Sequence, residues 1–399
     1  MRSRSLVVAC ILMVSMHAEA QISNNVVRIG ILSDMSGIFA TASGPGSVVA
    51  ARMAVEDFGA RVRGAPIEIV TADHQNKPDV GSTIVRKWFD TEDVDAIADI
   101  PVSSIALAAQ EIARQKRRTL LISGGSSSDL YGKACSPYSV QWADDTYALS
   151  SGTVKAVMQG GGDSWFFITV DFAFGHALER DAIRSVGQGG GKVIGSVRHP
   201  IGTLDLASFL LRAQSSGAKV VGLANVGSDT ANSVKQARQF GVQQSQSLVA
   251  FLMFLTDIEG LGLADAQGLY ILDGFYWDQN EASRKWSSRF LKRHGKMPTK
   301  DHAATYAAVL HYLRAIDAAG TDSADVVNAQ MRKMPIDYFG RSGSIRADGR
   351  VIYDLTLYQI KSPKESKYAW DFQKEIRTIA AAEAFRPEGE GGCPLASQR

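Results

Sequence analysis

The fold is decided by the stretch VVRIGIL at residues 26–32, which a Ser- and Gly-rich loop (33–46) and the pattern SVVAARMAVEDF (47–58) follow. The first stretch is a short, continuous apolar run of the kind that a buried parallel strand shows. Ser47 can cap a helix, which we expect over 48–58. Strand, loop and helix in this order form the first half of a parallel α/β unit.

This alternation continues along the chain in two successive series. In the first series we expect strands at 67–70, 96–100 and 119–122, with helices at 80–89 and 104–115. In the second we expect strands at 165–170, 192–197, 220–223, 248–252 and 268–272, with helices at 146–159, 175–186, 206–215 and 230–240. The two series predict an α/β protein with two Rossmann-like lobes built on parallel-sheet cores.

The last third of the chain departs from this alternation. We expect two amphipathic helices at 282–294 and 302–319, a late hairpin formed by 343–346 and 353–360, and surface coil beyond Arg386. No low-complexity linker separates the two series, so the chain should cross between the lobes more than once. The expected division is lobe 1 at 27–142 and 276–345, lobe 2 at 143–275 and 346–372, and a C-terminal tail at 373–399.

The N-terminus has the pattern of an export signal. Arg2 and Arg4 precede an apolar run at 6–16, which is too short to span a bilayer, and Ala18-Glu19-Ala20 supplies small residues for cleavage. These features predict a signal peptide at 1–20 and export to the periplasm. A buried N-terminal helix and lipidation at Cys10 remain open alternatives.

Composition limits the classes of partner. The chain has 399 residues, of which 45% are hydrophobic, as in an ordinary globular protein of about two domains. Without Arg2, Arg4 and Glu19, the 43 basic and 41 acidic residues become 41 and 40. A nearly neutral chain lacks the basic field that nucleic acid or anionic lipid would require, so neither is an expected partner.

Two cysteines remain once Cys10 leaves with the signal peptide. Cys135 and Cys393 would then share an oxidising compartment, which favours a disulfide between them. Such a bond would hold the C-terminal tail against the first lobe.

The glycine-rich motifs do not form a nucleotide site. Gly187 to Lys192 follows a helix and opens a strand, which is the reverse of the order in a phosphate loop. Gly44-Pro45-Gly46-Ser47 does follow a strand and open a helix. It is either an anion-binding turn or a plain connection.

The candidate catalytic groups lack their partners. Gly162-Asp163-Ser164 and Gly124 to Ser127 do not have the spacing of a nucleophile elbow, and His176 with Glu179 is only half a metal motif. The sequence therefore predicts no cofactor, no metal and no enzymatic reaction, with a periplasmic hydrolase as a remote alternative.

Hydroxyl and aromatic side chains recur at the carboxyl ends of the expected strands, where ligands bind in open α/β sheets. Hydroxyls and backbone N–H groups at helix N-termini suit a carboxylate. The loops concerned are 33–39, 101–104, 123–128, 171–174 and 225–229.

The order of several motifs carries a family resemblance. The motifs are Ile29-Gly30-Ile31-Leu32 with Ser36-Gly37, Leu121 to Ser127, Asp171 to Gly175, Val234 to Gly241, and Thr305 to Ala308. From Val27 to about Ile360 the chain resembles the periplasmic Leu/Ile/Val-binding protein family, the type I solute-binding proteins of ABC importers. The resemblance implies a two-lobed receptor with a hinge of several crossings, which closes on its ligand.

The resemblance also implies a site. In such proteins the Ser103-Ser104 and Ser126-Ser127 regions hold the ligand carboxylate, and the aromatic residue corresponding to Phe174 covers it. Members that bind amino acids usually carry an acid after the strand at 248–252, where this chain has an apolar stretch, and the loop at 226–228 is small. The departure favours a small carboxylic acid with an aromatic or apolar body over an amino acid.

The sequence thus predicts a monomeric periplasmic receptor that delivers a small carboxylate to an inner-membrane ABC permease. A ligand sensor of the same fold is the alternative. If an amino acid binds after all, Asp229 and Asp273 are the first candidates for its ammonium group. The predicted ligand-binding residues are Phe39, Ser103, Ser104, Ser126, Ser127, Asp171, Phe174, Asn225, Met253 and Tyr276.

Overall fold

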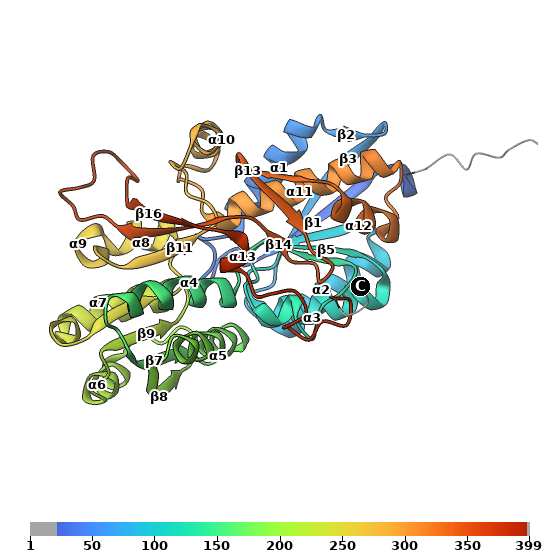
Figure 1. Cartoon of the computed structure of the whole chain (residues 1–399). Helices are drawn as coiled ribbons and strands as arrows, with labels where there is room; N and C mark the ends of the chain where they lie inside the picture. Colours follow the sequence, from blue (N-terminus) through green and yellow to red (C-terminus); the bar gives the residue numbers. More distant parts are fainter. Residues whose placement is uncertain (1–21, 397–399) are drawn as a thin grey trace, which may run out of the picture.

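The computed structural model of the protein describes residues 22–396. The predicted signal peptide at 1–20, and Cys10 with it, lies outside these residues. The described chain folds into two α/β lobes (Figure 1). Both lobes have parallel sheets at their cores, as the sequence predicts. Within the described part of the chain, no helix is both long enough and apolar enough to cross a bilayer.

Lobe 1 is built on a six-stranded sheet with the order β2-β3-β1-β4-β5-β6, parallel except for β2. The strands are β1 (Val27–Ser33), β2 (Arg61–Val62), β3 (Ala65–Asp73), β4 (Ala96–Asp99), β5 (Thr119–Ile122) and β6 (Ser139–Gln141). The helices that belong to this lobe are α1 (Gly44–Phe58), α2 (Pro78–Thr91), α3 (Ser103–Lys116), α10 (Glu281–His294), α11 (Lys300–Ala319) and α12 (Ala324–Lys333). In β1, Gly30 leaves space for Trp88, because a Cβ there would lie 2.4 Å from the indole ring.

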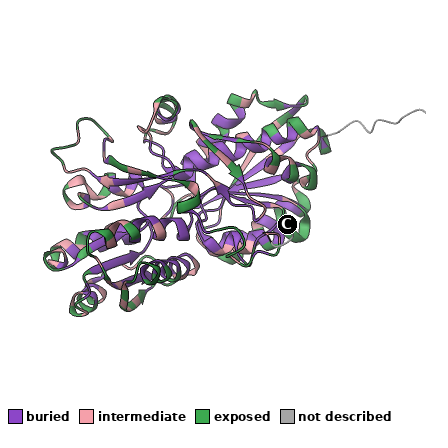
Figure 2. Ribbon diagram, in the orientation of Figure 1, coloured by how far each residue is buried: buried purple, intermediate pink, exposed green. Residues whose placement is uncertain are grey.

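Lobe 2 has a four-stranded parallel sheet with the order β10-β9-β7-β8. Its strands are β7 (Ser164–Val170), β8 (Lys192–His199), β9 (Val220–Ala224) and β10 (Ser247–Ala250). Its helices are α4 (Thr146–Gln159), α5 (Ala173–Gln188), α6 (Ala207–Ser215), α7 (Gly227–Gln239), α8 (Leu255–Leu261) and α9 (Leu263–Ala266). The central strand β9 is buried along its whole length, whereas residues of the edge strand β8 mostly alternate between exposed and half-buried; Figure 2 shows the burial of the sheet as a whole.

Two small antiparallel sheets complete the fold, and they correct the sequence analysis. One joins β11 (Tyr270–Asp273), β15 (Leu355–Ile360) and β16 (Gln373–Ile379); the other joins β12 (Ile336–Tyr338), β13 (Arg341–Ile345) and β14 (Val351–Ile352). The expected hairpin of 343–346 with 353–360 is wrong, because β13 and β15 pair in different sheets. The segment expected as tail, 373–399, begins with a paired strand and continues into α13 (Ala381–Ala384).

Before its C-terminal segment, the chain passes between the lobes at three hinge connections, which join β6 to α4, β11 to α10, and β14 to β15. Buried residues in and beside the first and third connections bind to each other. Arg350 is completely buried, and its Nε lies 3.0 Å from Oδ2 of Asp145, which caps α4. The Tyr353 hydroxyl donates to the Trp142 carbonyl at 3.0 Å. The hinge is therefore made of bonded, buried segments rather than a loose linker.

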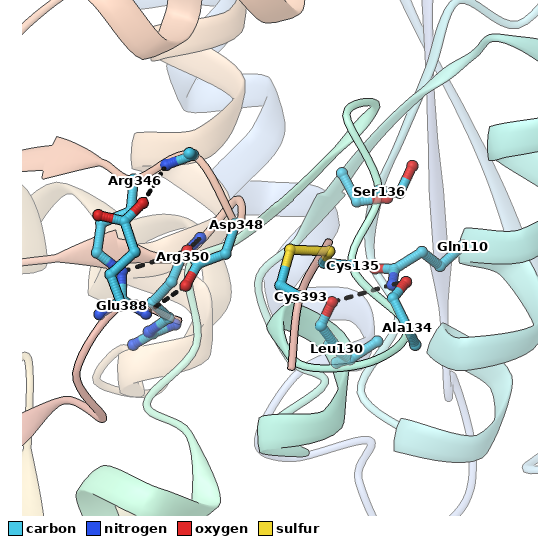
Figure 3. The surroundings of a disulfide bond; sticks show 12 residues. Gln110, Leu130, Ala134, Cys135, Ser136, Arg346, Asp348, Arg350, Glu388 and Cys393 are labelled. Carbon is cyan, nitrogen blue, oxygen red and sulfur yellow. Dashed lines mark hydrogen bonds and ion pairs between the residues drawn. A yellow bond between two sulfur atoms is a disulfide. The ribbon is translucent and has the colours of Figure 1, made fainter. Parts of the chain in front are cut away.

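The predicted disulfide between Cys135 and Cys393 is present, with Cα atoms 5.7 Å apart (Figure 3). Next to it, Gln110 donates from Nε2 to the Leu130 carbonyl at 3.0 Å and fixes the loop that carries Cys135. Arg386 also holds the tail to lobe 1, donating from Nη2 to the Ser128 carbonyl at 2.9 Å. The end of the chain thus returns from lobe 2 to lobe 1.

Candidate ligand-binding cleft

A small cavity lies between the lobes, at the carboxyl ends of their parallel strands. Its walls come from both lobes. The walls are formed by Phe39, Pro101, Gly124, Ser126, Phe172, Phe174, Val226, Leu252, Phe254 and Asp301. A cavity that is walled from both lobes suits a small molecule held between them.

Four of the wall residues are phenylalanines, one from lobe 1 and three from lobe 2. Phe39 and Phe174 are buried, at 4% and 3% exposure. Phe172 and Phe174 lie with ring centroids 6.1 Å apart and planes tilted by 31°. The tight start of α5 sets this pair, because a Cβ at Gly175 would lie 2.0 Å from the Val170 carbonyl oxygen. Such rings offer edge and offset faces to a flat apolar ligand.

Three of the residues predicted from sequence meet in the cavity wall: Phe39, Ser126 and Phe174. Two others support the wall from behind. The Ser103 hydroxyl accepts from the Ser127 N–H at 3.2 Å, and the Ser127 hydroxyl accepts from the Asp129 N–H at 3.3 Å. Ser127 therefore caps the short helix η2 (Ser128–Tyr131). Ser104 is half-buried in the first turn of α3 and is not part of the wall.

Two further predicted residues, Asp171 and Asn225, lie outside the cavity wall, and their side chains are bonded to other side chains. Asp171 is exposed, and its Oδ1 lies 2.6 Å from Nε2 of His176. Asn225 is completely buried, with its amide bonded to His199 at 3.0 Å and to Ser233 at 2.9 Å.

Met253 and Tyr276 also lie outside the wall, in the core of lobe 2. The reason at Met253 is the alternation of an extended chain, in which neighbouring side chains point to opposite sides. Leu252 and Phe254 line the cavity, so Met253 between them points away from it. Tyr276 donates from its hydroxyl to the Trp370 carbonyl at 3.0 Å.

The sequence analysis missed most of the wall, and above all Asp301. This residue lies in the first turn of α11 and is 3% exposed, with its Oδ2 3.2 Å from the Ser43 hydroxyl. Burial and the nearby Asp99 carboxyl raise the pKa of Asp301 well above its usual value. Burial likewise raises the pKa of Asp99 to about 7. Asp301 is far from the other lobe 1 wall residues in sequence, so no local pattern indicates its place.

Side chains of lobe 1 and lobe 2 also bond directly beside the cavity. Asp181 of α5 accepts from the Ser128 hydroxyl at 2.6 Å. Arg180 pairs with Asp129 at 3.1 Å. We call these two contacts the α5–η2 latch, and they join the lobes. Within lobe 2, Asp181 also accepts from the Thr146 hydroxyl at 2.6 Å. Among residues 22–396, no group of three or more His, Cys, Asp and Glu side chains could hold a metal ion.

Two α/β lobes that close over a small, ring-lined cavity define a solute-binding protein, which clamps its ligand in the cleft. The chain belongs to the periplasmic binding protein family, whose model matches residues 26–367. It is a member of the periplasmic binding proteins of ABC transporters, and its resemblance to the Leu/Ile/Val-binding proteins is confirmed.

Individual relatives agree with this assignment. A periplasmic binding protein of Burkholderia mallei is 44% identical, with a TM-score of 0.91 and coverage of 93% of this chain and 99% of that one. A branched chain amino acid ABC transporter periplasmic ligand-binding protein of Burkholderia xenovorans is 34% identical, with a TM-score of 0.84 and coverage of 93% and 100%. A Leu/Ile/Val-binding protein homolog of Brucella melitensis is 20% identical over 92% of this chain and 94% of its own length.

A solute-binding protein of R. palustris in complex with benzoate shares the fold, with a TM-score of 0.81, 17% identity, and coverage of 93% and 100%.

Proposed function

We propose that this protein captures a small carboxylic acid with an aromatic or apolar body, in preference to an amino acid, and delivers it to an inner-membrane ABC permease. It acts as a monomeric receptor, exported by the signal peptide at 1–20, and catalyses no reaction. The observation that carries the proposal is the cavity with four phenylalanine walls. Rings on several sides of a small space favour a flat, apolar ligand body.

The rest of the cavity favours an anionic head group on that body. Helices α3, α5, α7 and α11 all begin within two residues of a wall residue. Helix N-termini carry partial positive charge and free N–H groups, which stabilise a carboxylate. The Gly124 to Ser126 turn adds backbone and hydroxyl groups to the same wall.

Asp229 and Asp273, the two candidate partners for the ammonium group of an amino acid, already bind other groups of the protein. Asp229 accepts from the Gly202 N–H at 2.9 Å, and Asp273 binds Lys300 at 2.6 Å. The wall position after β10 is taken by Leu252 and Phe254. Burying an unpaired ammonium group beside these two apolar side chains would cost about 2 kcal/mol or more.

The names of similar proteins mention both an aromatic acid and amino acids. The R. palustris structure contains benzoate, whereas the name of the B. xenovorans protein refers to branched-chain amino acids. A decisive test must therefore offer both classes to the protein.

Calorimetry of the mature protein with benzoate, 4-hydroxybenzoate, leucine and valine makes this comparison. We expect micromolar or tighter binding of at least one aromatic acid and no heat from the amino acids. Phe174→Ala should weaken acid binding about tenfold or more, because it removes a buried ring contact. Phe240→Ala is the matched control, since Phe240 is a 41% exposed residue of the same lobe. Tight leucine binding without any response to aromatic acids would refute the proposal.

A further inference from the structure

Among the described residues, Asp301 is the one acidic side chain in the cavity wall, which it shares with Gly124. We propose that Asp301, in its neutral form, donates a hydrogen bond to the carboxylate of the ligand and thereby selects acids over amines. This inference rests on the proposed function, because it names the group that recognises the acid.

The position of Asp301 is fixed on the side away from the cavity. Its Oδ2 lies 3.2 Å from the Ser43 hydroxyl, just before α1. The neighbouring His302 donates from Nε2 to the Ser43 carbonyl at 2.8 Å and so fixes the same turn. With Oδ2 held by Ser43, the other carboxyl oxygen is the atom left for a ligand.

Within the described chain, no cationic side chain forms an ion pair with Asp301. The charged group next to it on α11, Lys300, is bonded to Asp273 at 2.6 Å and to Asp144 at 3.5 Å. From β4, Asp99 brings a second buried carboxyl, and its Oδ1 would lie 2.9 Å from a Cβ at Gly124. His302 is neutral, because burial lowers its pKa to about 3. The wall residues of lobe 2 are all apolar: Phe172, Phe174, Val226, Leu252 and Phe254.

A buried carboxyl with a second carboxyl nearby and no cation partner favours the protonated state. Burial and the Asp99 carboxyl accordingly raise the pKa of Asp301. A protonated carboxyl has one O–H donor, whereas an ionised one only accepts and would repel a ligand anion. The aromatic acid should therefore bind to the protein with Asp301 protonated.

Proton linkage predicts the direction in which the affinity for an acid changes with pH. Once the pH exceeds the pKa of Asp301 in the free protein, binding an acid requires uptake of a proton. Affinity should then fall by up to about tenfold for each further pH unit. An amine would show the opposite preference, because it needs the ionised form.

The test compares Asp301→Asn and Asp301→Leu with the wild type, using benzoate, 4-hydroxybenzoate and benzylamine as probes. An Asn amide keeps a donor for the ligand and an acceptor for Ser43 but cannot ionise. At pH 6 we expect Asp301→Asn to bind the acids within about threefold of wild type, and Asp301→Leu to lose about tenfold or more. From pH 6 to 9 the wild type should weaken about tenfold or more. Asp301→Asn should weaken clearly less, because only Asp99, with a pKa of about 7, still titrates beside the cavity.

The control is Asp79→Asn, at an exposed aspartate of α2 outside the cleft, which should follow the wild-type pH profile. Parallel pH profiles of wild type and Asp301→Asn, or full affinity in Asp301→Leu, would overturn the inference and leave the proposed function intact. Benzylamine binding that Asp301→Asn abolishes would also overturn it. Failure of every acid at every pH would refute the proposed function itself.

Proton uptake by the wild type provides a second readout that needs no variant. Acid binding is measured by calorimetry at pH 8 to 9 in two buffers with different heats of ionisation. We expect uptake of up to about one proton per bound acid. No uptake, together with acid binding that weakens over the same pH range, would overturn the role of Asp301.

Discussion

At the scale of single residues, Gly175 controls how the two phenylalanines of the α5 start face the cavity. A Cβ at this position would lie 2.0 Å from the Val170 carbonyl oxygen, so the start of α5 would have to shift. We expect Gly175→Ala to lower the free energy of unfolding by about 1–3 kcal/mol and to weaken ligand binding.

The matched control lies in the same helix. In the described part of the chain, a Cβ at Gly187 would meet no other group within 4 Å, so Gly187→Ala should be neutral or raise stability by up to about 1 kcal/mol. Thermal and denaturant unfolding of both variants checks this difference. Equal stabilities for the two variants would show that the contact with Val170 is not tight.

A second residue, His302, should make stability depend on pH. It is completely buried, accepts from the Thr299 N–H at Nδ1 (3.1 Å) and donates from Nε2 to Ser43 (2.8 Å), so it is neutral. Burial lowers its pKa to about 3, against about 6.5 in the unfolded chain. The unfolded chain therefore binds a proton that the folded protein does not, and stability falls as the pH drops below about 6.5.

His302→Gln isolates this effect. It should cost about 1–3 kcal/mol at pH 7.5, through lost hydrogen bonds, and the difference from wild type should shrink toward pH 5 by up to about 1.4 kcal/mol per pH unit. Urea unfolding at both pH values measures it. A difference that stays constant between pH 7.5 and 5 would mean that His302 already carries a proton in the folded protein.

Some residues of the cavity wall could be predicted from the sequence, and others could not. The apolar stretch at 251–255 does supply cavity walls in place of an acid, through Leu252 and Phe254. The predicted residue Met253 is not in the cavity wall, because nothing in an all-apolar run shows which alternate residues face the cleft. Asp301 escapes sequence analysis because a buried acid in a helix start is recognised only from its three-dimensional neighbours.

At the scale of elements, the C-terminal segment joins the two lobes. Glu383 of α13 pairs with Lys155 of α4, whereas Arg386 and Cys393 bind to lobe 1. The disulfide closes a long loop, with a sequence separation of 258 between its cysteines, and should stabilise the protein by about 2–4 kcal/mol. We expect Cys135→Ser/Cys393→Ser to lose about that much and still fold, since the polar contacts of the tail remain.

Thiol titration of the exported protein tests the bond itself. Denatured, unreduced protein should contain no free thiol, and dithiothreitol should release the thiols of both Cys135 and Cys393. Free thiols at both cysteines before reduction would contradict the pairing.

Elements differ in how well the sequence predicts them, for a physical reason. Buried parallel strands such as β1 and β9 are apolar along most of their length, so their positions are clear from the sequence. Strand β16 is mostly exposed and reads QKEIRTI, which has too few apolar residues to distinguish it from coil. The late strands also pair over long separations, which no local pattern fixes.

In the whole molecule, the proposed function requires two lobes that open and close around the cavity. The structure is closed: the α5–η2 latch joins the lobes, and the cavity walls come from both of them. Ligand contacts with both walls should favour this closed form over an open one. The three hinge connections and the buried pair of Arg350 with Asp145 should keep the hinge defined during such a motion.

Small-angle X-ray scattering of the mature protein, with and without saturating benzoate or the tightest-binding acid of the calorimetric panel, measures this closure. Ligand should lower the radius of gyration, and the liganded profile should match the closed two-lobed structure. Identical scattering profiles with and without saturating ligand would contradict a receptor that closes on its solute.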